Sequence, residues 1–120
     1  MKVTSEKFLL ASESSNYSLK IYELLSAKGH ACDHAFTGKD AQALLYKNSY
    51  STIILDLNLS NFSSIEILKY IKLSKITLRI VLFTEEPRIL ESLGLDKKQF
   101  IKMGVSDLIS AQKPEKLVEK

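Results

Sequence analysis

Short apolar runs alternate along this chain with longer segments in which apolar residues recur at helical spacing. The short runs are too brief for helices and are bounded by polar segments, so each is expected to form a strand. The clearest is 52–56, where three β-branched residues and a leucine end on one acidic residue. The expected strands are residues 8–11, 30–36, 52–56, 79–84 and 105–109.

Polar residues with capping chemistry mark the helix boundaries between these strands. Ser14 or Ser15 is the expected N-cap of the first helix, and Gly29 is its expected end. Residues 37–40 open a second helix, and residues 63–66 have the sequence of a capping box that starts a third. Each helix carries apolar residues on one side only, as expected for packing against a sheet.

Two prolines organise the second half of the chain. Pro87 suits the first turn of a fourth helix, which Gly94 interrupts, so that 95–103 forms a second helical piece. Pro114 begins a last, fifth helix, which is short at the end of the sequence. Its shortness favours a domain that was cut from a longer protein.

Strands that alternate with helices favour a parallel sheet with helices on both faces. We therefore expect one α/β domain over residues 1–120, with a doubly wound, five-stranded, flavodoxin-like sheet of order 2-1-3-4-5. In such sheets the ligand site lies at the carboxyl ends of the strands. Polar residues occupy three of these ends, namely Ser12 and Glu13, Asp56, and Thr84.

Burying a carboxylate at the end of a strand costs free energy unless a partner compensates it, so a functional reason to keep one is expected. Asp56 is therefore the residue best suited to a chemical role. A structural alternative is a carboxylate that only caps a loop. Glu13 is expected to meet Asp56 across neighbouring strand ends, where two carboxylates repel and a hard cation such as Mg²⁺ relieves the repulsion. A carboxylate in that setting can attack a phosphoryl group and become an aspartyl phosphate.

Composition and charge narrow the function classes. No apolar run is long enough to span a bilayer, and the single cysteine, Cys32, forms no internal disulfide, so we expect a cytoplasmic domain without membrane contact. The net charge of +3 lies entirely in the second half of the chain and lacks interleaved aromatic residues, which argues against direct nucleic-acid binding. His30 and His34 have no third ligand residue beside them and are interpreted as surface or edge-strand histidines. No glycine-rich nucleotide motif is present.

Four segments in order resemble the receiver domain of two-component response regulators, and the resemblance covers essentially the whole chain. Residues 8–13 resemble the first strand with its acidic pair, and 53–60 the phosphoacceptor segment. Residues 80–84 resemble the strand that ends in the switch hydroxyl, and 103–108 the run into the fifth strand.

The resemblance implies a role for each matching residue. Asp56 would be the phosphoacceptor, and a histidine kinase, a phosphotransfer protein or a small phosphodonor would supply the phosphoryl group. Glu13, Asp56 and the backbone carbonyl of Asn58 would bind Mg²⁺, and Thr84 would be the switch hydroxyl. An output domain or partner protein would bind the face formed by the fourth helix, the fifth strand and the fifth helix. Such a domain is not an enzyme beyond the phosphorylation and dephosphorylation of its own aspartate.

The sequence departs from the family around the phosphoacceptor. Ser12 stands where the family has a second acidic residue, and the proline and glycine expected after the phosphoacceptor are Ser60 and Ser64. Glu85, bulky and negative, follows the switch hydroxyl. These changes predict weak Mg²⁺ binding and slow phosphorylation.

The fifth strand departs as well. The family lysine falls at Ser110 or Ala111, and the aromatic switch residue is Leu108. Lys113 restores a Lys-Pro pair only with a shifted loop, and Pro114 fits better as a helix start.

Two functions therefore remain open. The first is a receiver that is phosphorylated on Asp56 inefficiently, and the second is a pseudo-receiver that binds proteins without phosphorylation. Leu108 predicts weak coupling between the site and the outer face, so that this face binds its partner in a largely fixed form. The lysines expected to give it a preference for acidic partners are Lys97, Lys98, Lys102, Lys113 and Lys116.

Overall fold

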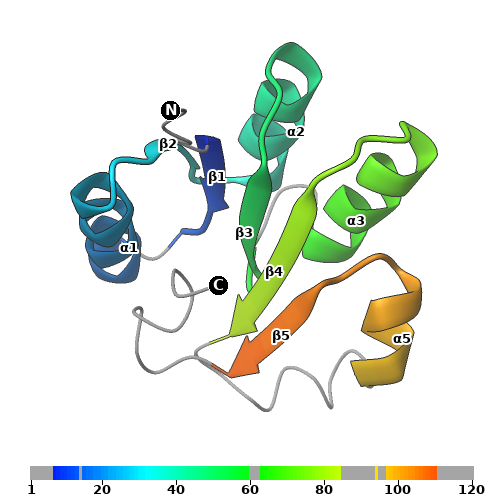
Figure 1. Cartoon of the computed structure of the whole chain (residues 1–120). Helices are drawn as coiled ribbons and strands as arrows, with labels where there is room; N and C mark the ends of the chain where they lie inside the picture. Colours follow the sequence, from blue (N-terminus) through cyan, green and yellow to red (C-terminus); the bar gives the residue numbers. More distant parts are fainter. Residues whose placement is uncertain (1–6, 14, 60–62, 85–93, 95–96, 111–120) are drawn as a thin grey trace, which may run out of the picture.

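A computed structural model places the strands in one five-stranded parallel sheet (Figure 1). The structure describes residues 7–13, 15–59, 63–84, 94 and 97–110. The sheet order is β2-β1-β3-β4-β5, which confirms the predicted doubly wound topology. The strands are β1 Lys7–Ala11, β2 Ala31–Ala35, β3 Thr52–Asp56, β4 Arg79–Thr84 and β5 Asp107–Ser110.

Four helices lie within the described residues, and each is too short or too polar to cross a membrane. They are α1 Ser15–Ala27, α2 Gly38–Lys47, α3 Ser64–Leu73 and α5 Lys97–Lys102. The helix predicted from Pro87 and the one predicted from Pro114 lie outside the described residues.

Several predicted element boundaries were slightly wrong; β1, for example, begins at Lys7 rather than at residue 8. The helical piece predicted over 95–103 is α5, and the strand predicted over 30–36 is β2, one residue shorter at each end. The strand predicted over 105–109 begins at Asp107, because the Val105 N–H still bonds the Phe100 carbonyl at the end of α5. The apolar pattern gave the right elements, but backbone hydrogen bonds decide where they end.

The sheet separates two apolar cores. On one face, Ile21 and Leu25 of α1 pack against residues such as Leu10 and Phe83. On the other face, α2, α3 and α5 cover a larger core, and Figure 1 shows these three helices side by side, opposite α1. The fully buried residues of this second core include Leu9, Ala41, Ile53, Leu55, Ile67, Leu82 and Phe100. The alternation of inward and outward residues along β1, β3 and β4 builds both cores at once.

The caps predicted for the second and third helices are present, whereas the Ser14 or Ser15 cap predicted for the first lies outside the described residues and side chains. The Thr37 side chain accepts a hydrogen bond from the Asp40 N–H at the start of α2. Ser63 and Glu66 exchange the two hydrogen bonds of a capping box at the start of α3.

Three helices end in a Schellman turn, whose first residue past the helix cap is left-handed. Gly29 after α1 and Gly104 after α5 take this position with φ of 82° and 97°. After α3 the same position is Lys75, with φ of 56°, where the Lys75 and Ile76 N–H groups bond the Lys72 and Ile71 carbonyls. A side chain is disfavoured in this conformation, so Lys75 carries local strain.

Ion pairs and hydrogen bonds join the elements near the amino ends of the strands. Tyr50 donates a hydrogen bond of 2.6 Å to the Asp33 carboxylate, and the Lys7 ammonium lies 3.5 Å from the same carboxylate. At β4 and β5, Arg79 pairs with Asp107 at 2.9 Å. Burial, followed by the hydrogen bond to Asp33, raises the pKa of Tyr50, so it stays a protonated donor. We call Lys7, Asp33 and Tyr50 the amino-end cluster.

Candidate functional site

Asp56 ends β3 and is 5% exposed, although it is a carboxylate. Its Oδ1 accepts a hydrogen bond of 2.9 Å from the Asn58 N–H, and its Oδ2 accepts one of 3.0 Å from the Ser12 hydroxyl. Burial raises the pKa of Asp56, the two hydrogen bonds lower it, and the charge of Glu13 raises it again; the net shift is upward. The side chain is therefore held in one position and is ionised at some energetic cost.

Ser12 takes part in the site in a way that the sequence did not reveal. The sequence indicated only a lost carboxylate, but Ser12 is fully buried and its hydroxyl bonds Asp56 directly. The parallel pairing of Ala11 with Leu55 brings the residues that follow them together. The neighbouring His34 ring lies 3.0 Å from the Ser12 carbonyl through Nε2, which ties the end of β2 to this strand end. The signal in the sequence that could have revealed this role was a polar residue directly after β1.

Glu13 lies beside Asp56, as expected from the strand order. It is exposed, and its charge is close enough to raise the pKa of Asp56. The two carboxylates therefore share one edge of the sheet, with one in solvent and the other buried.

Thr84 ends β4 at the same edge and is 1% exposed. Its neighbour Phe83 pairs with Asp56, and the Phe83 carbonyl accepts a hydrogen bond of 2.9 Å from the Leu57 N–H. Thr84 itself pairs with Ser110 of β5. The predicted switch residue Thr84 therefore directly follows Phe83, the strand partner of the predicted phosphoacceptor Asp56.

Several residues named from the sequence lie outside the described part of the chain: Ser60, Glu85, Ala111, Lys113, Pro114 and Lys116. Ser64 is described, and its hydroxyl lies 3.5 Å from the Leu57 carbonyl at the start of α3.

The donor set fits a magnesium ion held by few protein ligands. Within the described residues, no three His, Cys, Asp or Glu side chains gather closely enough to hold a metal. Mg²⁺ commonly binds through one or two carboxylates and keeps several waters, which matches Glu13, Asp56 and a backbone carbonyl at Asn58. Each Asp56 oxygen accepts one hydrogen bond in the structure and keeps capacity for another contact.

The histidines and the cysteine have structural surroundings. His30 lies just before the edge strand β2 and packs on Phe8, while His34 is within β2 and packs on Phe36. Cys32 is partly buried against the α1-side core, because β2 is an edge strand. Burial raises the pKa of the Cys32 thiol to about 11, which makes it unreactive at neutral pH.

Comparisons with known proteins give the fold class. No family model matches the chain, and no curated protein matches it in sequence. Among solved structures, the receiver domain of the Francisella response regulator 1452 is 20% identical, with a TM-score of 0.80 over 95% of this chain and 91% of that chain. The chemotaxis response regulator CheY4 of Vibrio cholerae is 22% identical, with a TM-score of 0.81 over 97% and 95%.

A third neighbour was solved with Mg²⁺ and a beryllium fluoride. It is the response regulator TrrA of Thermotoga maritima, which is 19% identical, with a TM-score of 0.77 over 95% of this chain and 94% of that chain. The chain therefore has the fold of response-regulator receiver domains.

Proposed function

We propose that this domain is a signal-transduction receiver that accepts a phosphoryl group on Asp56, slowly and with weakly bound Mg²⁺. The observation that carries the proposal is the position of Asp56. It is a buried carboxylate at the carboxyl end of the central strand, Glu13 lies beside it, and no ion pair to it exists among the described residues. A structural carboxylate this deeply buried would be expected to have a cationic partner.

In the proposed reaction, an Asp56 carboxylate oxygen attacks phosphorus and forms a new P–O bond. The bond from phosphorus to the donor atom breaks, and the donor leaves with the electron pair. Mg²⁺ would neutralise charge on the phosphoryl oxygens. The Asn58 N–H and the Ser12 hydroxyl hold the carboxylate in place, and Thr84 would bind a phosphoryl oxygen.

Two features account for slow transfer. The first is the Ser12 hydroxyl, whose hydrogen bond withdraws electron density from Oδ2, and the second is a missing cation. Neither Ser110 nor Ala111 offers an amine to the phosphoryl group. One missing contact of that kind costs about 3 kcal/mol of transition-state stabilisation.

The proposed phosphodonors are a histidine kinase or a phosphotransfer protein, in a cytoplasmic setting that suits the unpaired Cys32. Leu19, Tyr22 and Phe36 give such a protein an exposed apolar surface on α1 and at the end of β2. The output partner would bind the face that the resemblance assigns to the fourth helix, the fifth strand and the fifth helix. No further catalytic activity is proposed.

The same Ser12 hydrogen bond also favours the alternative, a pseudo-receiver that binds partners without phosphorylation. Treatment with acetyl phosphate and MgCl₂, followed by intact-mass measurement, separates the two. We expect a slow gain of one phosphoryl group that is absent in Asp56→Asn and retained in the exposed control Asp40→Asn. Failure of the wild type to gain mass at saturating Mg²⁺ would favour the pseudo-receiver, and labelling of Asp56→Asn would exclude Asp56 as the acceptor.

A further inference from the structure

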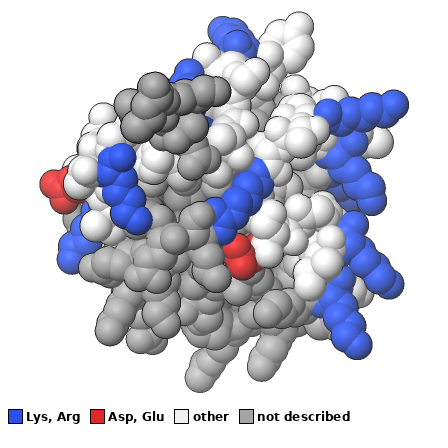
Figure 2. All heavy atoms as spheres, in the orientation of Figure 1, with Lys and Arg blue, Asp and Glu red and all other residues white. Residues whose placement is uncertain are grey.

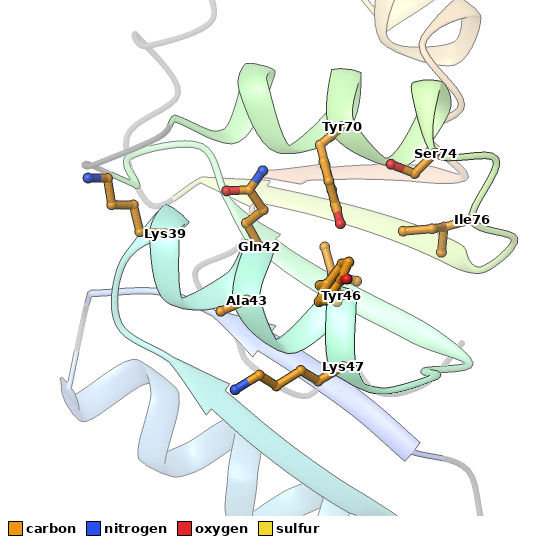
Figure 3. A pocket seen from close by; sticks show the side chains of 9 residues that line it. Lys39, Gln42, Ala43, Tyr46, Lys47, Tyr70, Ser74 and Ile76 are labelled. Carbon is orange, nitrogen blue, oxygen red and sulfur yellow. The ribbon is translucent and has the colours of Figure 1, made fainter.

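A hollow of about 740 Å³ lies between α2 and α3, and none of the residues of the Asp56 site lines it (Figure 3). Figure 3 shows Tyr70 pointing from α3 toward α2, where Tyr46 stands beside it. The hollow has the size of pockets that hold small ligands or a few side chains. Its lining residues are Lys39, Gln42, Ala43, Leu45, Tyr46, Lys47, Tyr70, Ser74 and Ile76.

Two large side chains are unusually exposed on the helices that border this hollow, Tyr46 in its lining and Leu73 outside it. Tyr46 is 81% exposed, and Leu73 is 83% exposed, three positions after Tyr70 and thus on a neighbouring part of the α3 surface. Ile76 and Tyr70 are only partly buried against the core. An exposed aromatic ring beside a partly buried one can enclose an inserted apolar side chain.

Two smaller hollows extend this surface around the end of α3. One, of about 350 Å³, shares Tyr46, Lys47 and Ile76 with the first and reaches Tyr50. The other, of about 280 Å³, shares Ile76 with both and reaches Lys102 of α5. Ile76 therefore borders all three hollows, which we together call the α2–α3 groove.

The charge of the α2–α3 groove has one sign. Lys39 and Lys47 line its α2 side, and Lys72 and Lys102 line the part between α3 and α5. No aspartate or glutamate lines any of the three hollows, and none of these four lysines has an ion pair within the described chain. Figure 2 shows basic side chains along the side of the molecule where Figure 1 places α3 and α5.

We propose that the α2–α3 groove binds an acidic protein segment through a bulky apolar side chain inserted between Tyr46 and Tyr70. The acidic residues of the bound segment would pair with the surrounding lysines, and no acidic residue that lines the groove would repel them. The apolar hollow between the tyrosines favours a peptide over a nucleic-acid backbone, which would need a continuous basic track. Because the groove shares no residue with the Asp56 site, this binding is independent of phosphorylation.

Fluorescence polarisation with labelled amphipathic peptides tests the proposal. The probes are a peptide of glutamates with leucine and phenylalanine at helical spacing, its lysine counterpart, and a glutamate peptide without apolar residues. Only the first should bind. Tyr46→Ala should weaken it roughly tenfold, as for a central aromatic anchor. Lys47→Glu should weaken it about fivefold, since an exposed charge contributes less.

Matched variants on α1 are the controls. Tyr22→Ala and Lys20→Glu remove exposed side chains of the same two kinds from the opposite face and should leave the affinity for the peptide unchanged. Beryllofluoride with Mg²⁺ should also leave it unchanged, so failure of the proposed phosphorylation does not affect this test. Equal binding of the acidic and basic peptides would overturn the proposal. So would tighter binding of a DNA duplex, or Tyr46-dependent dimerisation that blocks the peptide.

Discussion

The carboxylates at the two ends of the parallel sheet have different partners. At the amino end, Asp33 is met by a tyrosine hydroxyl and a lysine, and Asp107 is met by an arginine. At the carboxyl end, Asp56 is more deeply buried, receives only neutral donors, and has a second carboxylate nearby. Carboxylates with cationic partners stabilise a fold, whereas a buried one without a partner is retained at a cost. The difference supports the proposal that the carboxyl end is the functional edge.

The largest expected effect is at the amino end. Asp33→Ala removes the hydrogen bond from the buried Tyr50 and the ion pair to Lys7, and we expect a loss of about 2 kcal/mol in the free energy of unfolding. Urea unfolding measures it, with the exposed Glu23→Ala on α1 as the control. A loss no greater than that of the control would show that the amino-end cluster does not stabilise the fold.

A metal-binding change at the carboxyl end is expected next. Ser12→Asp removes the hydroxyl that bonds Asp56 and adds a third carboxylate, so the affinity for Mg²⁺ should rise about tenfold because ligand charge sets affinity for hard cations. Calorimetric titration gives the dissociation constant. Ser12→Asn has the same size as the aspartate variant but no charge, and an equal gain from it would contradict the electrostatic reasoning.

Removing the buried charge should stabilise the protein. Asp56→Asn is expected to raise the free energy of unfolding at neutral pH by about 1 kcal/mol, as is common when a functional charge is lost. The folded state binds more protons because the pKa of Asp56 is raised from its ordinary value of 3.8. Wild-type stability therefore falls as pH rises through the folded pKa, and the advantage of the variant should grow over the same range. An advantage that instead shrinks with rising pH would reverse the sign of the proposed pKa shift.

The smallest expected effect on stability also refines the comparison of the two sheet ends, because one residue near the amino end of the sheet has a strained backbone. Lys75 has φ of 56° in the turn between α3 and β4, where the equivalent turns after α1 and α5 use glycine. Lys75→Gly should add about 0.5 kcal/mol by relieving that strain. Thermal unfolding of Lys75→Gly and of Lys72→Gly, which lies inside α3 and should destabilise, distinguishes the turn from a general effect of glycine.

The sequence predicted the elements well because burial on both faces leaves a strong signal. The runs 52–56 and 79–84 coincide with β3 and β4, and the order of strands follows from the alternation with helices. Asp56, Glu13 and Thr84 were placed at one edge for the same reason. The metal contacts and the phosphorylation chemistry stay predictions.

Contacts between distant residues were not predictable in the same way. The hydrogen bond from Ser12 to Asp56 joins residues 44 positions apart, and its existence depends on the register of β1 with β3. The amino-end cluster joins Tyr50 to Asp33 and Lys7 through side-chain geometry that leaves no periodic pattern. The left-handed Lys75 carries no glycine signal at all.

The strand order also governs when the Asp56 site can assemble during synthesis. β3 pairs with β1 on one side and β4 on the other, so its second neighbour exists only after residue 84 has left the ribosome. Before residue 56 emerges, β1 has only β2 as a neighbour, and before residue 84 emerges the other edge of β3 stays open. Nascent chains emerge from the amino terminus, and such edges invite misassociation. On the ribosome, the edge of β1 therefore needs protection from misassociation first, and the edge of β3 needs it second.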